Sequence, residues 1–197
     1  MTGYLDITFG PMFSGKTSNL VEKINNYIVF KSIEGKNIKG LIINSSLDNR
    51  DINKIENLTT HNQFIKDFKL PSNIESMSCK TLMPFSEKVD NYDYIAIDES
   101  QFFEDLEPFV KAMLKKGKYI HCVGLIADSE KNTFGQMHKI FAMADNITQL
   151  KAFCVQCKNW HKNASFTKWI SNEDKNQAIC VSGKDKYVPV CGKHYQS

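Results

Sequence analysis

A glycine-rich stretch near the start of the chain carries the clearest chemistry. Residues 10–17 read G-P-M-F-S-G-K-T and fit the pattern G-x-x-x-x-G-K-[ST] of phosphate-binding loops. In such a loop, backbone N–H groups point inward, and the N-terminus of the following helix adds partial positive charge that suits a polyphosphate. Lys16 can reach the β- and γ-phosphates of a nucleotide, and the Thr17 hydroxyl can ligate Mg²⁺. The candidate phosphate-binding residues are Gly10, Pro11, Met12, Phe13, Ser14, Gly15, Lys16 and Thr17.

The segments on either side of this loop have the periodicity that the motif requires. Residues 4–9 alternate and are rich in β-forming side chains, which predicts a strand. Leu20, Val21, Ile24 and Ile28 recur at helical spacing, which predicts a helix directly after the loop. A glycine-rich turn with a solvated Lys16 is the alternative, and the strand and helix make it the weaker one.

A second nucleotide-related signal is the run I-A-I-D-E at residues 95–99. Apolar residues that lead into a carboxylate place Asp98 at the C-terminal end of a strand, where ligands bind in open α/β sheets. Asp98 could hold Mg²⁺, directly or through water, and Glu99 would then be free to accept a proton from a nucleophile. The alternative is an Asp-Glu pair that opens a surface turn.

Cysteine and histidine gather near the end of the chain in two pairs. Cys154 and Cys157 form one C-x-x-C pair, and Cys191 and His194 form a C-x-x-H pair. Two such pairs from separate turns supply the closed tetrahedral N/S ligand set of structural Zn²⁺. The 33 residues between the pairs suit two knuckles joined by a β-hairpin. Rival ligands are His161 and Cys180, which otherwise read as a surface histidine and a packed cysteine.

Composition narrows the class of protein. The net charge of +3 is mild and the lysines are spread along the chain, so no nucleic-acid partner is expected. No apolar run approaches the 18 residues of a membrane span, so no membrane partner is expected either. The first predicted strand begins at Tyr4 and leaves no room for a signal or transit peptide, which predicts a cytoplasmic protein. Six cysteines in that setting favour metal ligands or free thiols over disulfides.

The rest of the chain alternates predicted strands and helices. Strands are expected at 38–44, 74–79, 94–97, 119–125 and 147–153, helices at 84–91, 102–116 and 137–144, and loops at 45–61 and 126–135. This alternation predicts an α/β fold with a mostly parallel sheet. Four of the six cysteines lie between Cys154 and Cys191, which predicts a main ATP-binding domain over 1–153 and a zinc-binding lobe over 154–197.

Taken together, these motifs resemble the thymidine kinases of the tetrameric, zinc-containing (cellular, type II) family. The resemblance covers nearly the whole chain: G-P-M-F-S-G-K-T, then Asp48-x-Arg50, then I-D-E-S-Q-F-F at 97–103, then the two zinc pairs. It extends to A-x-F-T at 164–167 and G-x-D-K-Y at 183–187. It implies a P-loop (RecA-like) parallel sheet flanked by helices, with a small C-terminal zinc-binding lobe that contributes to a lid over the nucleoside.

The resemblance also implies the reaction and the residues that serve it. A member of this family is expected to transfer the γ-phosphate of ATP to the 5′-hydroxyl of thymidine, with deoxyuridine as a further candidate acceptor, in the salvage route to DNA precursors. Glu99 would be the general base, Thr17 and Asp98 would hold Mg²⁺, and Asp48 and Arg50 would lie near the phosphates. The implied assembly is a homotetramer. The implied nucleoside contacts are Met12, Gln101, Phe102, Leu125, Phe134, Thr167, Val181 and Tyr187.

Three positions depart from the family pattern. Ile126 stands where the lid usually has Asp, and Ser129 stands where an aromatic residue is common. Trp169 stands where the zinc lobe often has Arg. These differences bear on lid geometry and base selectivity and leave the phosphate chemistry intact.

Two other functions fit parts of the sequence. A nucleic-acid-dependent ATPase with a zinc knuckle would share the loop and the Asp98-Glu99 pair, with Glu99 activating water. The modest charge and the lack of a basic-aromatic stripe count against it. A catalytically weakened homologue that binds nucleosides or regulates a partner is the third possibility, supported only by the altered lid.

Overall fold

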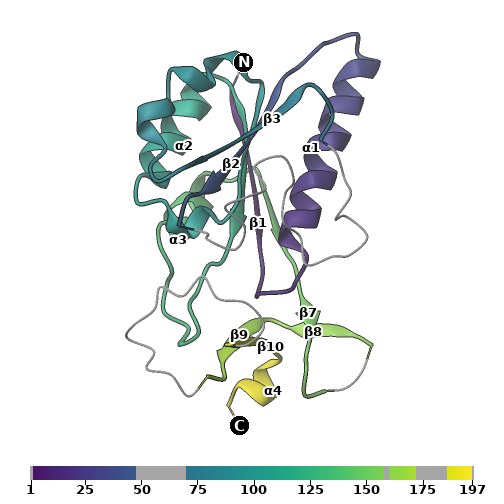
Figure 1. Ribbon diagram of the computed structural model, residues 1–197, viewed down its shortest axis with the longest axis vertical. Helices are drawn as coiled ribbons and strands as arrows, with labels where there is room; N and C mark the ends of the chain where they lie inside the picture. Colours follow the sequence, from purple (N-terminus) through teal and green to yellow (C-terminus); the bar gives the residue numbers. More distant parts are fainter. Residues whose placement is uncertain (1, 48–69, 158–159, 172–185, 197) are drawn as a thin grey trace.

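The computed structural model describes residues 2–47, 70–157, 160–171 and 186–196. Its centre is a six-stranded sheet in the order β3-β2-β4-β5-β1-β6, and every paired neighbour runs parallel (Figure 1). Because parallel strands are covered on both faces, the central strands β2 and β4 read as nearly continuous apolar runs. The strands are β1 (Tyr4–Phe9), β2 (Gly40–Ser45), β3 (Ile74–Cys79), β4 (Tyr94–Ile97), β5 (Tyr119–Gly124) and β6 (Asn146–Gln149).

Helices cover both faces of this sheet. The helix α1 (Lys16–Ile33) lies on one face, and α2 (Leu106–Lys115) and α3 (Met137–Ile140) lie on the other (Figure 1). Leu20 and Ile24 of α1 are fully buried in the first layer, and Phe109 and Met113 of α2 are fully buried in the second. The prediction of an α/β fold with a mostly parallel sheet is confirmed.

The remaining elements are short. Single 3-10 turns occur at η3 (Met83–Phe85), η4 (Lys88–Asn91), η5 (Ser100–Phe102) and η6 (Phe141–Met143). A C-terminal lobe consists of two antiparallel ribbons and one helical turn: β7 (Ala152–Phe153) with β8 (Lys162–Ala164), β9 (Phe166–Trp169) with β10 (Tyr187–Val190), and α4 (Gly192–Tyr195). This lobe lies beneath the C-terminal ends of the sheet strands, next to the end of β1 (Figure 1).

One predicted strand and three predicted helices differ from the structure. The expected strand at 147–153 is wrong as a single strand. The Leu150 N–H still pairs with the Phe9 carbonyl (2.7 Å), but the chain then leaves the sheet, and Ala152 pairs with Ala164 in the lobe. The helix expected at 84–91 is two 3-10 turns, and that at 137–144 is one α-helical turn followed by a 3-10 turn. The helix expected at 102–116 begins as an α-helix only at Leu106.

A buried polar cluster lies between the sheet and α1. Lys23 of α1 forms a 2.8 Å ion pair with Asp6 of β1. His121 of β5 is fully buried, with its Nε2 atom 2.9 Å from the Thr8 hydroxyl and its Nδ1 atom 3.0 Å from the Tyr94 hydroxyl. Burial lowers the pKa of His121 to about 3, so the ring is neutral at physiological pH. The Lys23–Asp6 ion pair fixes α1 against the sheet, and the contacts of His121 join β5 to β1 and β4 behind the loop that precedes the helix.

Candidate functional site

The glycine-rich loop connects β1 to α1 at the C-terminal edge of the sheet. Gly15 has φ +88°, a left-handed conformation that glycine adopts without strain. A Cβ atom on Gly10 would lie 2.5 Å from the Leu150 carbonyl oxygen, so only glycine fits there. Lys16 begins α1 and its ammonium donates to the Pro11 carbonyl at 3.0 Å. The loop therefore has the strand–turn–helix geometry that its sequence motif requires.

The acidic pair follows β4, two strands away from β1. The Thr17 hydroxyl, in the first turn of α1, donates a 3.0 Å hydrogen bond to Asp98. Asp98 is almost fully buried, and this burial together with the neighbouring Glu99 carboxylate raises the pKa of Asp98 to about 7. A cation bound between Thr17 and Asp98 would favour the ionised carboxylate, so the pair suits a metal-bound nucleotide.

Glu99 is held in an unusual backbone conformation, with φ +48°. Its carboxylate accepts a 2.6 Å hydrogen bond from the side-chain NH₂ group of Gln101. The side-chain carbonyl oxygen of Gln101, Oε1, accepts a hydrogen bond from the backbone N–H of Leu125 at 2.9 Å. A Cβ atom on Gly124 would lie 2.3 Å from that Gln101 oxygen. Gln101 therefore links the acidic pair to the segment that follows β5.

That segment is a hairpin, which we call the 125–135 hairpin. The Phe134 N–H donates to the Ile126 carbonyl at 3.0 Å, and Ala127 pairs with Thr133 in an antiparallel bridge. Phe134 meets Phe102 edge to face, with ring centroids 5.5 Å apart. The expected loop at 126–135 is thus an ordered hairpin, and it brings together three of the predicted nucleoside contacts, namely Phe102, Leu125 and Phe134.

The C-terminal lobe touches the glycine-rich loop directly. The backbone N–H of Met12 donates a 3.0 Å hydrogen bond to the hydroxyl of Thr167 on β9. Thr167 is paired with Pro189 of β10, and Tyr187 at the start of β10 packs edge to face on Trp169, with ring centroids 4.9 Å apart. The structure therefore places Thr167 beside the loop, with Tyr187 on the neighbouring strand of the same ribbon.

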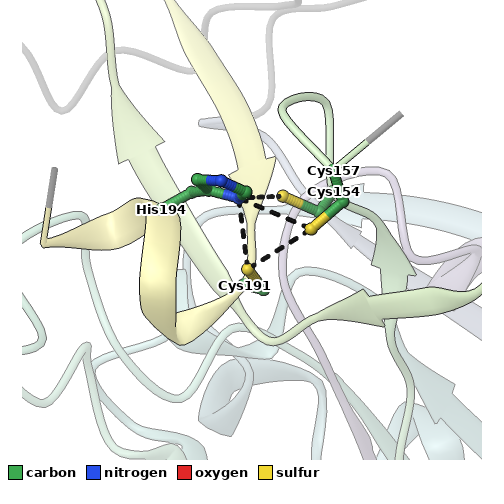
Figure 2. A group of neighbouring side chains, drawn as sticks. All are labelled: Cys154, Cys157, Cys191 and His194. Carbon is green, nitrogen blue, oxygen red and sulfur yellow. Dashed lines mark hydrogen bonds between the residues drawn. The ribbon is translucent and has the colours of Figure 1, made fainter. Parts of the chain in front are cut away.

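The four predicted zinc ligands come together in the lobe. The ligand atoms of Cys154, Cys157, Cys191 and His194 all lie within 4.8 Å of one another (Figure 2). The His194 Nδ1 atom is 3.4 Å from each of the three sulfur atoms, and the Sγ atoms of Cys157 and Cys191 are 3.6 Å apart. A tetrahedral site with Zn–S bonds of about 2.3 Å has ligand atoms about 3.8 Å apart, so the cluster fits this ion.

The local electrostatics also favour a metal-binding thiolate. Burial raises the pKa of the Cys154 thiol, but hydrogen bonds from the backbone N–H groups of Cys191, Gln156 and Cys157 and from His194 outweigh it and lower the pKa to about 6. His161, the rival histidine, is exposed and packs on the Trp160 ring at a centroid distance of 4.1 Å. Cys180, the rival cysteine, lies outside the described residues, as do Asp48, Arg50 and Val181.

The sequence did not indicate Lys131, Tyr195 or the contacts that Gln101 makes in this site. Gln101 was expected as a nucleoside contact, but its hydrogen bonds to Glu99 and to the Leu125 N–H form only because the chain returns to the same sheet edge. Lys131 at the tip of the hairpin and Tyr195 of α4 contact each other, with the Lys131 ammonium 3.9 Å from the Tyr195 ring centroid. The one signal in the sequence is that Tyr195 is aromatic and directly follows His194, a predicted zinc ligand.

The chain is similar in sequence to known thymidine kinases. The family model described as thymidine kinase matches residues 3–195. The thymidine kinase of Amsacta moorei entomopoxvirus is 41% identical over 197 residues, which covers 98% of each chain. Thymidine kinase 1 of Dictyostelium discoideum is 33% identical over 199 residues, which covers all of this chain and 79% of the relative. The thymidine kinase of rice is 34% identical over 199 residues, covering 98% of this chain and 66% of the relative.

The chain belongs to the thymidine kinase family. The predicted family and the predicted enzyme class, a kinase that phosphorylates thymidine, are confirmed, and a kinase of this family uses ATP. The nucleic-acid-dependent ATPase is not favoured. In the part of the chain that the structure describes, no helix has the length and apolarity needed to span a membrane.

Proposed function

We propose that this thymidine kinase homologue transfers the γ-phosphoryl group of ATP to the 5′-hydroxyl of thymidine, with Glu99 as the general base. The observation that carries the proposal is the 3.0 Å hydrogen bond between Thr17 of the glycine-rich loop and Asp98, the neighbour of Glu99. It joins the residues suited to phosphates and metal to a carboxylate suited to accept a proton, at one edge of the sheet.

The glycine-rich loop would bind the phosphates of ATP. The backbone N–H groups of the loop and the positive end of α1 favour an anion at this position. The Ser14 hydroxyl is buried and has no hydrogen-bond partner among the described residues, so it is available as a further donor. The Lys16 ammonium, which contacts the Pro11 carbonyl, would exchange that contact for phosphate oxygens and stabilise charge in the transition state.

Thr17 and Asp98 would hold the Mg²⁺ that accompanies ATP. The Thr17 hydroxyl and the Asp98 carboxylate are hard oxygen donors, the kind that Mg²⁺ prefers. When bound, the ion supplies neutralisation of the phosphate charge. Asp98 then keeps the ionised form that burial alone disfavours.

Glu99 would take the proton of the attacking hydroxyl. Its carboxylate accepts a hydrogen bond from the Gln101 side chain, and the same side chain accepts the N–H of Leu125, the first residue of the 125–135 hairpin. The 5′-hydroxyl attacks the γ-phosphorus in line, its proton passes to the Glu99 carboxylate, and ADP leaves. Exclusion of water by the hairpin would prevent hydrolysis of ATP.

The nucleoside would lie between the hairpin, the Phe102 ring and the C-terminal lobe. Phe102 and Phe134 offer an aromatic wall, and Thr167 and Tyr187 offer hydroxyl groups from the lobe. Cys154, Cys157, Cys191 and His194 would hold a Zn²⁺ ion, which supplies cross-linking of the lobe. Family resemblance extends the proposal to a cytoplasmic homotetramer with a main domain over 1–153 and a lobe over 154–197, joined by β7, which pairs with β8 of the lobe.

A phosphorylation assay with Mg·ATP tests this function. The five acceptors are thymidine, deoxyuridine, deoxycytidine, deoxyadenosine and deoxyguanosine, and Lys16→Met serves as the control for contaminating kinases. We expect product from thymidine above all others. Product mainly from another nucleoside would keep the chemistry and move the base selectivity to the residues around Ile126 and Ser129. Tight thymidine binding with no product would instead mark a weakened homologue.

A further inference from the structure

We propose that Tyr195 and Lys131 form a clasp that fastens the tip of the 125–135 hairpin to the C-terminal lobe and thereby positions the hairpin for nucleoside binding. The two residues are positioning residues, because they act on the hairpin and leave the reacting atoms to others. The inference rests on the proposed function in one respect, namely that the hairpin covers a bound nucleoside.

The contacts of the clasp are specific. The Tyr195 hydroxyl donates a 2.7 Å hydrogen bond to the Ser129 carbonyl at the hairpin tip. The Lys131 ammonium lies 3.9 Å from the centroid of the Tyr195 ring and 4.5 Å from that of Phe166, within the range of cation–π attraction. The two rings pack on each other with centroids 5.5 Å apart. One lysine therefore faces an aromatic pair that belongs entirely to the lobe.

The tip of the hairpin is built to present these groups. The Asp128 carboxylate accepts the N–H groups of Glu130 and Asn132 at 2.8 and 2.9 Å, which closes the turn. Lys131 adopts φ +67°, a conformation that glycine or asparagine would adopt at less cost. A lysine at this position is explained by the contact that its ammonium makes with the two rings.

The other end of the hairpin lies at the catalytic carboxylate. Leu125 is bonded to Gln101, which holds Glu99, and Phe134 packs on Phe102. The hairpin is thus fastened at its base to the main sheet and at its tip to the lobe. Loss of the contact at the tip would therefore change the position of the hairpin between the main sheet and the lobe.

The lobe side of the clasp is continuous with the candidate zinc site. Tyr195 directly follows the ligand His194 in α4, a single turn that starts after the ligand Cys191. Phe166 lies on β9, one residue before Thr167, which binds the glycine-rich loop. A change in the position of the four candidate zinc ligands would therefore shift Tyr195, and with it the hairpin tip, through the single turn of α4.

The first test is native-state cleavage of the substrate-free protein by a glutamate-specific protease. The rate of cleavage of the bond after Glu130 measures how often the hairpin tip detaches from the lobe. Tyr195→Phe removes the hydroxyl and keeps the ring, and we expect cleavage about 2- to 10-fold faster, as for loss of one hydrogen bond. Lys131→Met removes the charge, and we expect cleavage about 2- to 5-fold faster after correction for the rate on the denatured chain. Lys131→Arg keeps the cation and should restore the wild-type rate.

The second test is the steady-state kinetics of the same variants. We expect the KM for thymidine to rise by a factor similar to the change in cleavage, with the KM for ATP and the kcat within about 2-fold. Lys193→Met, at an exposed position of α4, is the matched control and should change neither cleavage nor kinetics.

The outcomes separate the clasp from the reaction. Unchanged cleavage in both Tyr195→Phe and Lys131→Met would overturn the clasp. Faster cleavage with an unchanged KM for thymidine would overturn its part in nucleoside binding. Wild-type protein that phosphorylates no thymidine would contradict the proposed function, while the cleavage comparison, which needs no substrate, would still decide the clasp.

Discussion

The side-chain amide of Gln101 donates a 2.6 Å hydrogen bond to the Glu99 carboxylate. Because its carbonyl oxygen accepts the Leu125 N–H at 2.9 Å, the amide has one orientation, with nitrogen toward Glu99. Glu99 itself sits at φ +48°, which turns its side chain at the end of β4. The proposed base is therefore fixed by a neighbour that also fixes the start of the 125–135 hairpin.

Replacement of Glu99 by Gln tests the proposed base. The amide keeps the size of the side chain but cannot accept the proton, so we expect kcat to fall by about 10²-fold or more while ATP binding persists. Turnover and ATP affinity are measured on the same preparation. Glu104→Gln, an exposed neutralisation on the same segment, is the control. Turnover that stayed at the wild-type level would remove Glu99 from the role of base.

Replacement of Gln101 by Met tests whether this residue acts through Glu99. Methionine has a similar length and no hydrogen bonds, so we expect kcat to fall about 10-fold as the carboxylate loses its orientation. The decisive variant is the double substitution with Glu99→Gln. If Gln101 works through Glu99, the double variant is no slower than Glu99→Gln alone, whereas multiplied losses would show an independent role.

Two substitutions of Thr17 test the proposed metal position. Thr17→Val keeps the shape and removes the hydroxyl that meets Asp98, so we expect the Mg²⁺ concentration for half-maximal rate to rise about 10-fold or more. Thr17→Ser retains the hydroxyl and should remain close to wild type. The measurement is a Mg²⁺ titration of turnover at saturating thymidine. Equal Mg²⁺ dependence in the two variants would place the ion elsewhere.

The central strands of the sheet could be predicted because they are buried on both faces. Parallel strands such as β2 and β4 read as short apolar runs, and the buried positions of α1 recur at helical spacing, so sequence alone located them. The strand expected at 147–153 failed for a tertiary reason. Residues 150 and 151 carry the chain from the sheet to the lobe, and the apolar pattern does not record which partner a strand pairs with.

The parts of the candidate site that could be predicted from the sequence are those formed by short local motifs. The glycine-rich loop, the acidic pair and each of the two zinc pairs span only a few residues, so the spacing of residues within each motif predicts its local geometry. The contacts of Gln101 with Leu125, of Met12 with Thr167 and of Lys131 with Tyr195 join segments far apart in the chain. These contacts depend on how the lobe docks on the sheet, which single-sequence periodicity does not contain.

Removal of zinc should release the lobe while the main sheet persists. The chain has two tryptophans, Trp160 and Trp169, and both lie in the C-terminal lobe, so intrinsic tryptophan fluorescence reports on this lobe alone. We expect a chelator to shift the emission to longer wavelength and to abolish thymidine binding, with most of the far-UV circular dichroism retained. Zinc added back should reverse both changes.

The matched variant for this experiment is Cys191→Ser, which weakens the ligand set without a chelator. It should show the chelated spectrum at ordinary zinc concentrations and recover partly at high zinc. Metal-free protein that kept its thymidine affinity would contradict the proposed structural role of the four ligands.

The buried histidine predicts how stability depends on pH. Burial lowers the pKa of His121 to about 3 in the folded protein, against about 6.5 in an unfolded chain. Between these values the unfolded state binds a proton that the folded state does not, so this histidine makes stability fall as the pH drops below about 6.5. The slope is about 1.4 kcal/mol per pH unit for one proton. Above about pH 6.5 the contribution is flat, because both states hold a neutral ring.

His121→Asn isolates this contribution from that of the carboxylates. The variant loses the contacts with Thr8 and Tyr94, so we expect it to be less stable than wild type at pH 7.5. It also lacks the group that titrates, so its deficit should be smaller at pH 5 by about 2 kcal/mol, the slope multiplied over the pH units below 6.5. Urea unfolding at both pH values measures the deficit, with exposed His138→Asn as the control. A deficit that is equal at the two pH values would show that the pKa of His121 in the folded protein is close to its value in the unfolded chain, and would contradict the effect of burial.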